Sequence, residues 1–259
     1  MKRMVNKQEI RLRELAPRDE IEFLIQEATQ AVEDDLALED AGWINLSSTT
    51  GDVITDAERI VNLKLSRLYA TKDPMGKQAI RLWTDYTFGN GMVWDTEDEG
   101  AKKALESFWD AKANQSVLGA RGQRKSSDKL LIDGEVFFAL FLGTTATIRW
   151  IDPLEITEII TDPDDKENIK FYRRQWTDAQ GTSHTGAYRS VTNTKDEATK
   201  DAAGASVQKT EDALIYHLAY NTITQRGNPL LLPALIWMKY HTKFLASRIA
   251  VMLALAKFA

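Results

Sequence analysis

The stretch DGEVFFALFLGTTATIRWIDP, from Asp133 to Pro153, marks the point where the chain changes from helical to strand-like patterning. Strand-forming residues from Glu135 to Leu142 and from Thr147 to Ile151 flank the short sequence Gly143-Thr144-Thr145. Two apolar runs separated by a few turn residues that include glycine indicate a β-hairpin. The fold class therefore depends on what lies on either side of this hairpin.

Helices are expected before the hairpin. Thr55 and Glu58 have the spacing of a capping box, and Asp73-Pro74 opens a second helix with proline at its first position. Further helices are expected from Thr96 to Ala113 and over NQSVLGARGQRKSSDKLL (114–131), where two glycines weaken the pattern. Ile60, Val61, Leu65 and Leu68 follow at helical spacing in the first helix, and Ala79, Ile80, Trp83 and Thr87 line one face of the second.

More strands are expected after the hairpin. EITEIIT (155–161) and NIKFYRRQW (168–176) flank the turn sequence DPDDKE, and SHTGAYRSV (183–191) and ALIYHLAY (213–220) supply further strands. A small, polar segment between these last two has almost nothing to bury and indicates a surface loop. Helices, then strands, then one long helix after Pro229, without a βαβ rhythm, predict an α+β fold with an antiparallel β meander.

Composition excludes several classes of protein. The chain contains no cysteine, which excludes disulfide scaffolds, thiolate metal sites and cysteine nucleophiles. Its net charge of -5 has the wrong sign for a protein that grips nucleic acid over a broad basic surface. The charged N-terminus lacks the apolar core of a secretion signal, and charged residues interrupt the apolar C-terminal stretch, so no membrane span is expected.

The sequence contains no recognisable catalytic or cofactor motif. His184, His217 and His241 lack zinc-ligand spacing and are interpreted as packing or surface residues. The basic run GARGQRKSS (119–127) has its lysine in the wrong register for a phosphate-binding loop, and GNGMVWDTEDEG (89–100) lacks the third glycine of a dinucleotide fingerprint. We therefore expect neither an enzyme nor a cofactor.

One acidic segment leaves a catalytic alternative open. Asp162, Asp164, Asp165 and Glu167, with Lys166 among them, have the residue types of a metal-dependent nuclease or another DNA-processing enzyme. Such sites usually bring their ligands together from a pair of strands, whereas these five residues crowd one turn. A solvated hairpin turn is the simpler interpretation of Asp162–Glu167, and a nuclease is the alternative function.

The order of several turn motifs resembles the portal protein of tailed bacteriophages. The motifs are Phe88–Gly91 at the end of a helix, Asp133–Glu135 before a hairpin, Ile151–Pro153 after it, His217 in a late strand, and Arg226–Pro229 before a long helix. The resemblance covers about Ser47 to Ala259, and its specificity lies in the order and spacing of the motifs. It implies a ring, typically dodecameric, at one capsid vertex, which conducts double-stranded DNA during packaging and ejection.

The resemblance also implies a division of the chain and a set of partners. Residues 1–46 are expected to be an N-terminal helical arm, 47–227 the wing domain and 228–259 the first stem helix, with the clip, second stem helix and crown beyond Ala259. The implied partners are further copies of the chain, double-stranded DNA in the channel, the major capsid protein, the large terminase subunit and head–tail connector proteins. The implied location is the virion, with host cytoplasm during assembly and no membrane.

The last helix has two polar lines separated by apolar flanks. At about 100° per residue, Lys239, Lys243 and Lys257 fall on one line and Arg248 lies nearly opposite. The apolar flanks between these lines include Ile236, Leu245, Ile249, Met252 and Phe258.

A helix in a ring needs two apolar flanks, one for each neighbouring subunit. We therefore expect the flank residues at subunit interfaces, and either the three lysines or Arg248 facing the channel, in loose contact with DNA phosphates. Arg226, Gly227 and Pro229 form the turn that leads into this helix. Two alternatives remain: a helix in an ordinary bundle with solvated lysines, and an adaptor protein that assembles without a channel.

Overall fold

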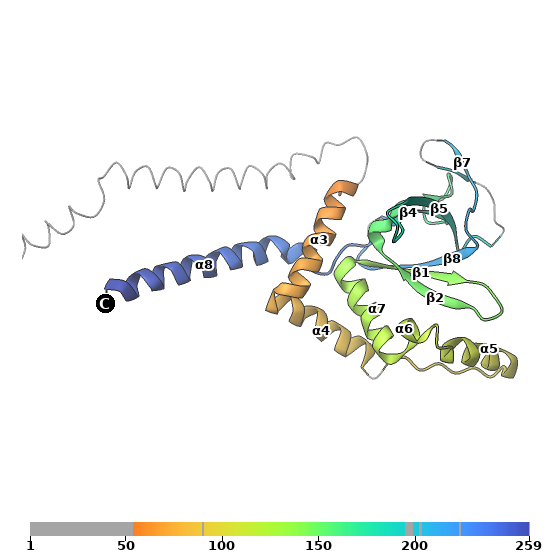
Figure 1. The fold of residues 1–259 in the computed structure, drawn as a ribbon, viewed down its shortest axis with the longest axis horizontal. Coiled ribbons are helices and arrows are strands. Elements are labelled where there is room, and N and C mark those ends of the chain that lie inside the picture. The colour runs from red at the N-terminus through yellow and green to blue at the C-terminus, as the bar shows by residue number, and fades with distance from the viewer. Residues whose placement is uncertain (1–53, 90, 195–198, 202–203, 223, 259) are drawn as a thin grey trace, which may run out of the picture. The chain divides into compact units, whose positions relative to one another are not determined.

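The computed structural model describes residues 54–258 apart from 90, 195–198, 202–203 and 223, and side chains as far as residue 253 (Figure 1). The predicted arm, residues 1–46, lies outside the described residues. Within them the chain is α+β, as predicted. The α-helices described are α3 (Asp56–Lys72), α4 (Pro74–Phe88), α5 (Glu99–Asp110), α6 (Gln115–Leu118), α7 (Ala120–Asp133) and α8 (Leu235–Phe258).

Helices α3 and α4 begin where the capping signals predict. The Thr55 hydroxyl accepts a hydrogen bond from the Glu58 amide at 3.3 Å. The Asp73 carboxylate accepts the amides of Met75 and Gly76, each at 2.9 Å. These bonds satisfy N–H groups that have no partner inside the helix. The prediction of both helix starts is confirmed.

Most of the apolar residues noted at helical spacing in α3 are not its buried residues. Val61, Leu65 and Leu68 are exposed, whereas the buried face centres on Leu63 and Ser66. The Ser66 hydroxyl donates a 2.6 Å hydrogen bond to the backbone carbonyl of residue 132 in α7. A buried hydroxyl is tolerated where it finds such a partner, and an apolar periodicity does not reveal a partner so distant in sequence. The apolar residues spaced along α3 therefore do not mark its buried face.

The region predicted as a fourth helix consists of two helices. Gly119, with an extended backbone (ψ 158°), separates α6 from α7. Asn114, just before α6, is fully buried and accepts the Ile148 amide of β2 at 3.0 Å. Its amide group donates to the carbonyls of Phe108 and Ala146 at 2.8 and 3.0 Å. Asn114 thus covers the free edge of the first hairpin, which would otherwise expose unpaired backbone groups.

The sheet is mixed rather than a simple antiparallel meander. Its order is β2-β1-β8-β5-β4-β3, so β8 lies between the first hairpin and the later strands. β8 pairs antiparallel with β1 from Glu135↔Ala219 to Phe141↔Ala213, and parallel with β5 through Arg189 and Ser190. The strands are β1 (Glu135–Phe141), β2 (Thr147–Ile151), β3 (Ile156–Thr161), β4 (Ile169–Thr177), β5 (Ser183–Ser190) and β8 (Ala213–Ala219), with a separate pair, β6 (Thr199–Lys200) and β7 (Ser206–Val207). The meander prediction holds for β3-β4-β5 and is wrong for β8.

Strand β1 is buried on both faces and lies at the centre of the core. Phe137 packs with Tyr172 and Ile215 on one face, whereas Val136 and Phe138 on the other face pack with residues of α6. Alternate residues of a strand point to opposite faces. Figure 1 shows α6 and α7 beside the β1–β2 hairpin, where they cover this second face. The hairpin recognised in the sequence therefore joins the two halves of the core.

Arg67 of α3 ties the helices to both ends of the hairpin. Its guanidinium donates to Asp133 at 2.7 and 2.8 Å and to Asp152 at 2.8 and 3.1 Å. These hydrogen bonds, first that to Asp133, raise the pKa of Arg67. Burial opposes ionisation of Asp152, but the bonds from Arg67 and from the Leu154 amide outweigh it and lower the pKa of Asp152. The Asp152 carboxylate is thus held in its charged form.

Asp152→Asn should reduce the amount of unfolding free energy that the chain loses in acid. The pKa of Asp152 is lower in the folded chain than in the unfolded one. Its charge therefore adds stability that is fully present above the unfolded value, about 4, and that is lost as the pH falls through the folded value. Urea denaturation at about pH 7 and about pH 3 should show a smaller fall in unfolding free energy for the variant than for wild type. Asp110→Asn, at an exposed position of α5, is the control, and equal falls for Asp152→Asn and wild type would contradict the expectation.

Candidate assembly interface

Two glycines hold the chain before α8 against the start of the sheet. Gly134 ends α7 with a left-handed backbone (φ 80°), and Gly227 lies directly against it. A Cβ at Gly134 would collide with the Asn228 backbone, and a Cβ at Gly227 would collide with the Gly134 carbonyl. Backbones approach this closely only where side chains are absent. The glycines of two separate sequence motifs therefore form one contact.

Backbone hydrogen bonds extend this contact toward α8. The Tyr220 amide donates to the Gly134 carbonyl at 2.7 Å, and the Asn228 amide donates to the Tyr220 carbonyl at 3.0 Å. The Leu230 amide donates to the Leu131 carbonyl of α7 at 2.9 Å. Because Leu131 also packs with residues at the start of α8, the beginning of the long helix is fixed to the end of α7.

Glu135, the first residue of β1, is the centre of a buried charge cluster. Its side chain is 1% exposed and its carboxylate lies 3.3 Å from Arg226, 3.3 Å from His217 and 3.6 Å from Arg59. The Gly227 amide donates to the same carboxylate at 3.4 Å. A buried charge requires such opposite charges and donors to offset its lost hydration. The carboxylate therefore joins α3, β1, β8 and the turn before α8.

Arg226 of the predicted turn extends its side chain into this charge cluster. Burial lowers its pKa, and the attraction of Glu135 works against that effect. The guanidinium donates to the Ile156 carbonyl at 2.6 Å and lies 5.7 Å from the Phe137 ring centroid. Phe137 in turn stacks on His217 at 4.2 Å. The predicted turn residues Arg226, Gly227 and Pro229 are thus brought together with the Asp133–Glu135 and His217 motifs.

Only part of this cluster was predicted from the sequence. Glu135 and His217 were motif positions and Arg226 was part of a turn, but Arg59 had no predicted role. His217 is a packing residue, as interpreted, since its side chain is 5% exposed and stacked on Phe137. The signal that could have led to the cluster is the acidic residue at the start of an otherwise apolar strand.

Helix α8 loses contact with the rest of the described chain after its first turns. Leu235 is buried, Met238 is half-buried beside α4, and every described side chain from Tyr240 to Leu253 is exposed. Figure 1 shows α8 beginning beside α3. The predicted interface positions Ile236, Leu245, Ile249 and Met252 are 52%, 46%, 60% and 64% exposed.

Three of the four cations predicted to face a channel, Lys239, Lys243 and Arg248, have described side chains on α8. The Lys243 ammonium lies 5.9 Å from the Tyr240 ring centroid, and the Arg248 guanidinium lies 5.8 Å from that of Phe244. Lys239 is half-buried near the start of the helix. Lys257 and the predicted interface residue Phe258 belong to α8, but their side chains lie outside the described part.

The acidic segment of the nuclease alternative forms the turn between β3 and β4. The Asp162 carboxylate accepts the Asp164 amide at 3.1 Å and lies 3.4 Å from the Lys170 ammonium. The Asp165 carboxylate accepts the Glu167 amide at 3.0 Å. These are local turn contacts. Among the described residues, no three His, Asp or Glu side chains converge on a point that could hold a metal ion.

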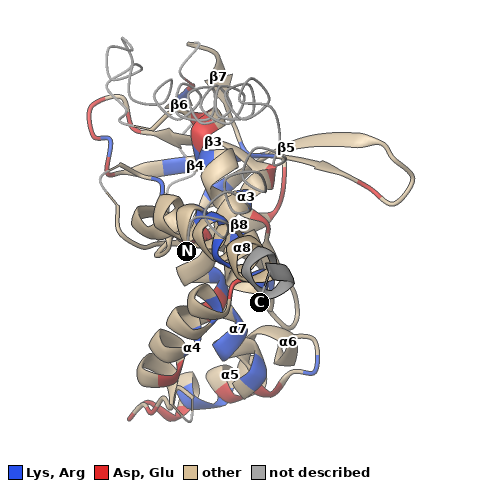
Figure 2. Ribbon diagram, turned by 90° about the vertical axis from the view of Figure 1, so that its left-hand side faces the viewer, with Lys and Arg blue, Asp and Glu red and all other residues tan. Residues whose placement is uncertain are grey.

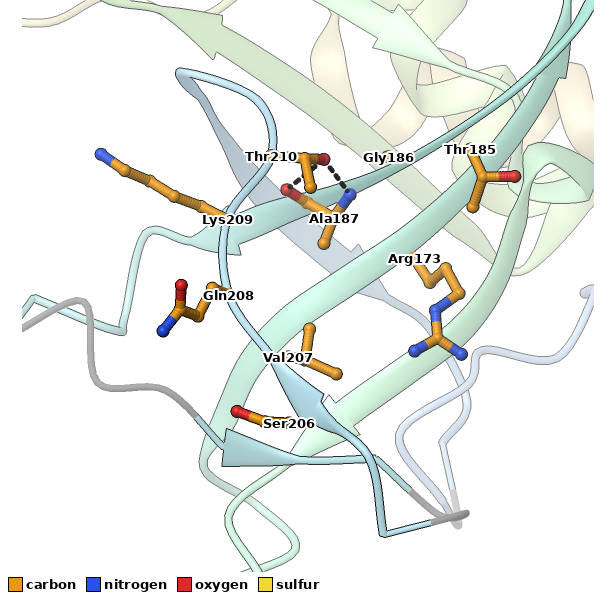
Figure 3. A pocket seen from close by; sticks show the side chains of 9 residues that line it. All are labelled: Arg173, Thr185, Gly186, Ala187, Ser206, Val207, Gln208, Lys209 and Thr210. Atoms are coloured by element: carbon orange, nitrogen blue, oxygen red, sulfur yellow. Dashed lines mark hydrogen bonds between the residues drawn. The ribbon is translucent and has the colours of Figure 1, made fainter.

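A hollow of about 600 Å³ is lined by residues of β4, β5, β7 and the segment that follows β7 (Figure 3). The Thr210 hydroxyl accepts the Ala187 amide at 2.7 Å at one wall of the hollow. Arg173, on the opposite side, pairs with Glu158 at 2.6 Å and with Asp201 at 2.9 Å. Because both carboxylates hold its guanidinium, Arg173 stabilises the strands around the hollow.

Neither a scan against known protein families nor a search of curated proteins returns a match for this chain. No helix within the described residues combines the length and the apolar character that a membrane span requires. The function must therefore be argued from the residues and their geometry.

Gly134→Ala should destabilise the chain more than Gly181→Ala. Both glycines have a left-handed backbone (φ 80° and 85°), but Gly181 has nothing near the position of a Cβ. Gly181→Ala should cost about 1 to 2 kcal/mol for the backbone alone. Gly134→Ala should cost about 1 to 3 kcal/mol more, because the added methyl group must displace the Asn228 backbone. Thermal or urea unfolding measures both, and equal costs would refute the close contact.

Glu135→Gln should cost about 3 to 5 kcal/mol of unfolding free energy, because it leaves the buried Arg226 without its counter-charge. Glu155→Gln is the matched control. The Glu155–Arg174 pair is partly exposed, so its loss should cost less than about 1 kcal/mol. Similar costs for the two variants in urea denaturation would show that Glu135 is not a central constraint.

Proposed function

We propose that this chain is a portal protein, one subunit of a closed, dodecameric ring through which double-stranded DNA enters and leaves a bacteriophage capsid. The observation that carries the proposal is the exposure of α8. From Tyr240 to Leu253 its described side chains are all exposed, although many are large and apolar. Soluble proteins rarely leave so large a continuous apolar surface uncovered. The order of the turn motifs indicates the portal family. The uncovered apolar helix indicates that neighbouring copies of the chain cover it.

The exposed apolar residues of α8 fall on two flanks. At about 100° per residue, the flanks are separated by the line that carries His241 and Arg248, and the lysines lie on the remaining side. One flank contains Trp237, Tyr240, Phe244 and Val251, and the other contains Leu245, Ile249 and Met252. Two different flanks favour head-to-tail contacts that close into a ring over a two-fold dimer, which would use one self-complementary patch.

The helical part of the wing offers a second apolar surface near the start of α8. Met75, Leu82 and Trp83 of α4 are 65%, 46% and 52% exposed and line a shallow groove of about 420 Å³. Ala79, at the base of this groove, packs with the cluster that contains Leu235 of α8. The groove therefore lies next to the cluster that anchors the start of α8. We assign both the groove and the exposed surface of α8 to contacts between neighbouring subunits.

The proposal gives each predicted region a role. Residues 47–227 are the wing and 228–259 the first stem helix. Either Lys239, Lys243 and Lys257, or Arg248 on the other polar line, face the channel and contact DNA phosphates weakly, because strong contacts would resist sliding. The partners are the major capsid protein, the large terminase subunit and head–tail connectors, in the virion and, during assembly, in host cytoplasm.

Native mass measurement and negative-stain images of the purified chain test the proposal. We expect a ring with a central hole. Leu245→Glu with Ile249→Glu should convert rings to monomers and raise the concentration needed for assembly by more than about tenfold, since it places charges in an apolar contact. Ala250→Glu, on the lysine line of the same helix, should leave the rings intact.

A stable monomer that degrades DNA when magnesium is added would overturn the proposal in favour of the nuclease. A closed oligomer without a hole would also overturn it, since it would indicate an adaptor. Assembly that survives Leu245→Glu with Ile249→Glu would contradict the assignment of α8 to the subunit contact.

A further inference from the structure

The basic run that fails as a phosphate-binding loop forms a line of cations on α7. Arg121, Lys125 and Lys129 are spaced four residues apart, which places them on one side of the helix. Arg121 and Lys125 are exposed and Lys129 is half-buried. Figure 2 shows the positive charge on α7. We call these three residues the α7 basic stripe.

The ring of Trp150 on β2 holds two of the three cations. The Lys125 ammonium lies 4.9 Å and the Lys129 ammonium 5.8 Å from its ring centroid. The indole N–H donates to the Ser126 hydroxyl at 2.9 Å, and that hydroxyl donates to the Gly122 carbonyl at 3.0 Å. The ring is therefore fixed to α7 itself. A fixed ring face attracts ammonium groups and restrains two side chains that would otherwise move freely.

This arrangement works against helix stability. Like charges four residues apart repel each other, and Arg121 lies in a first turn that has no acidic residue, where the helix dipole disfavours cations. The described residues give the stripe no ion pair: Asp85 is bonded to Arg124, Asp128 to Thr84 and Asp133 to Arg67. Asp152 is close enough for Lys129 to help lower its pKa, but Arg67 holds both of its oxygens. The stripe therefore remains available for an external anion.

We propose that the α7 basic stripe binds the phosphate backbone of double-stranded DNA at a site separate from α8. The stripe extends about 12 Å along the helix axis, a length over which duplex DNA presents about seven phosphate charges. The Lys125 ammonium lies 4.9 Å over the Trp150 ring, so an unpaired base that stacked there, as in single-strand binding, would have to displace it. The contact is therefore to phosphates and independent of sequence.

That the bound polyanion is DNA rests on the proposed function, whereas the arrangement of the three cations does not. A portal wing that contacts packaged DNA needs weak, sequence-independent binding, and a three-cation stripe on an acidic chain supplies no more than that. An acidic protein segment is the competing ligand, and a poly-glutamate peptide represents it in the test.

The test is the salt dependence of duplex binding by the full chain, measured by fluorescence anisotropy with a labelled duplex of mixed sequence. Each phosphate contact contributes about -0.9 to the slope of log K against log salt. Lys125→Gln with Lys129→Gln should therefore make the slope shallower by about 1.8. Lys64→Gln with Lys77→Gln, at exposed positions of α3 and α4, should leave it unchanged, and Lys125→Arg with Lys129→Arg should preserve binding.

An unchanged slope in the Lys125→Gln, Lys129→Gln variant would overturn the inference, as would an equal loss in the control. Stripe-dependent binding of a poly-glutamate peptide as tight as that of the duplex would reassign the site to an acidic protein segment. Negative-stain images of the same samples separate the two proposals. If the images show rings but the Lys125→Gln, Lys129→Gln variant keeps the wild-type salt slope, the DNA-binding stripe is refuted and the ring is not. If the images show monomers but the variant has a shallower slope, the ring is refuted and the stripe is not.

Discussion

The arrangement of this chain depends on the buried carboxylate of Glu135. It lies at the first position of the first strand and is approached by Arg59 from α3, His217 from β8 and Arg226 from the turn before α8. A charge this deeply buried is stable only while its partners stay in place. The direction in which α8 leaves the rest of the described chain is therefore coupled to the packing of α3 and β1. The Gly134–Gly227 contact adds a steric constraint at the same point.

The described surface offers two kinds of contact region. Many of its exposed large apolar residues lie on α8, α3 and α4, and its cations without an ion pair include the stripe on α7. Apolar contact suits permanent association between subunits, because it gains free energy with the area buried. Weak, salt-sensitive contact suits a moving polyanion. A ring that holds its subunits firmly and its DNA loosely would use both kinds of surface.

Local signals predicted the elements well and their packing poorly. The caps at Thr55 and Asp73 and the hairpin around Gly143 were read from a few residues each, and the structure confirms them. The spacing of apolar residues in α3 did not mark its buried face, since Ser66 is buried through a bond to α7 that no periodicity reveals. The place of β8 was missed for the same reason, because its partners β1 and β5 are distant in sequence.

By itself, the sequence determined where α3, α4 and the first hairpin begin, and that the last helix has two apolar flanks. These features follow from backbone preferences and from spacing within one element. The tertiary structure alone decided that Glu135, Arg59, His217 and Arg226 meet, that two distant glycines touch, and that Trp150 holds two lysines of α7. Contacts of this kind depend on how folded elements are placed in space, because burial and charge pairing act between residues that no local pattern connects.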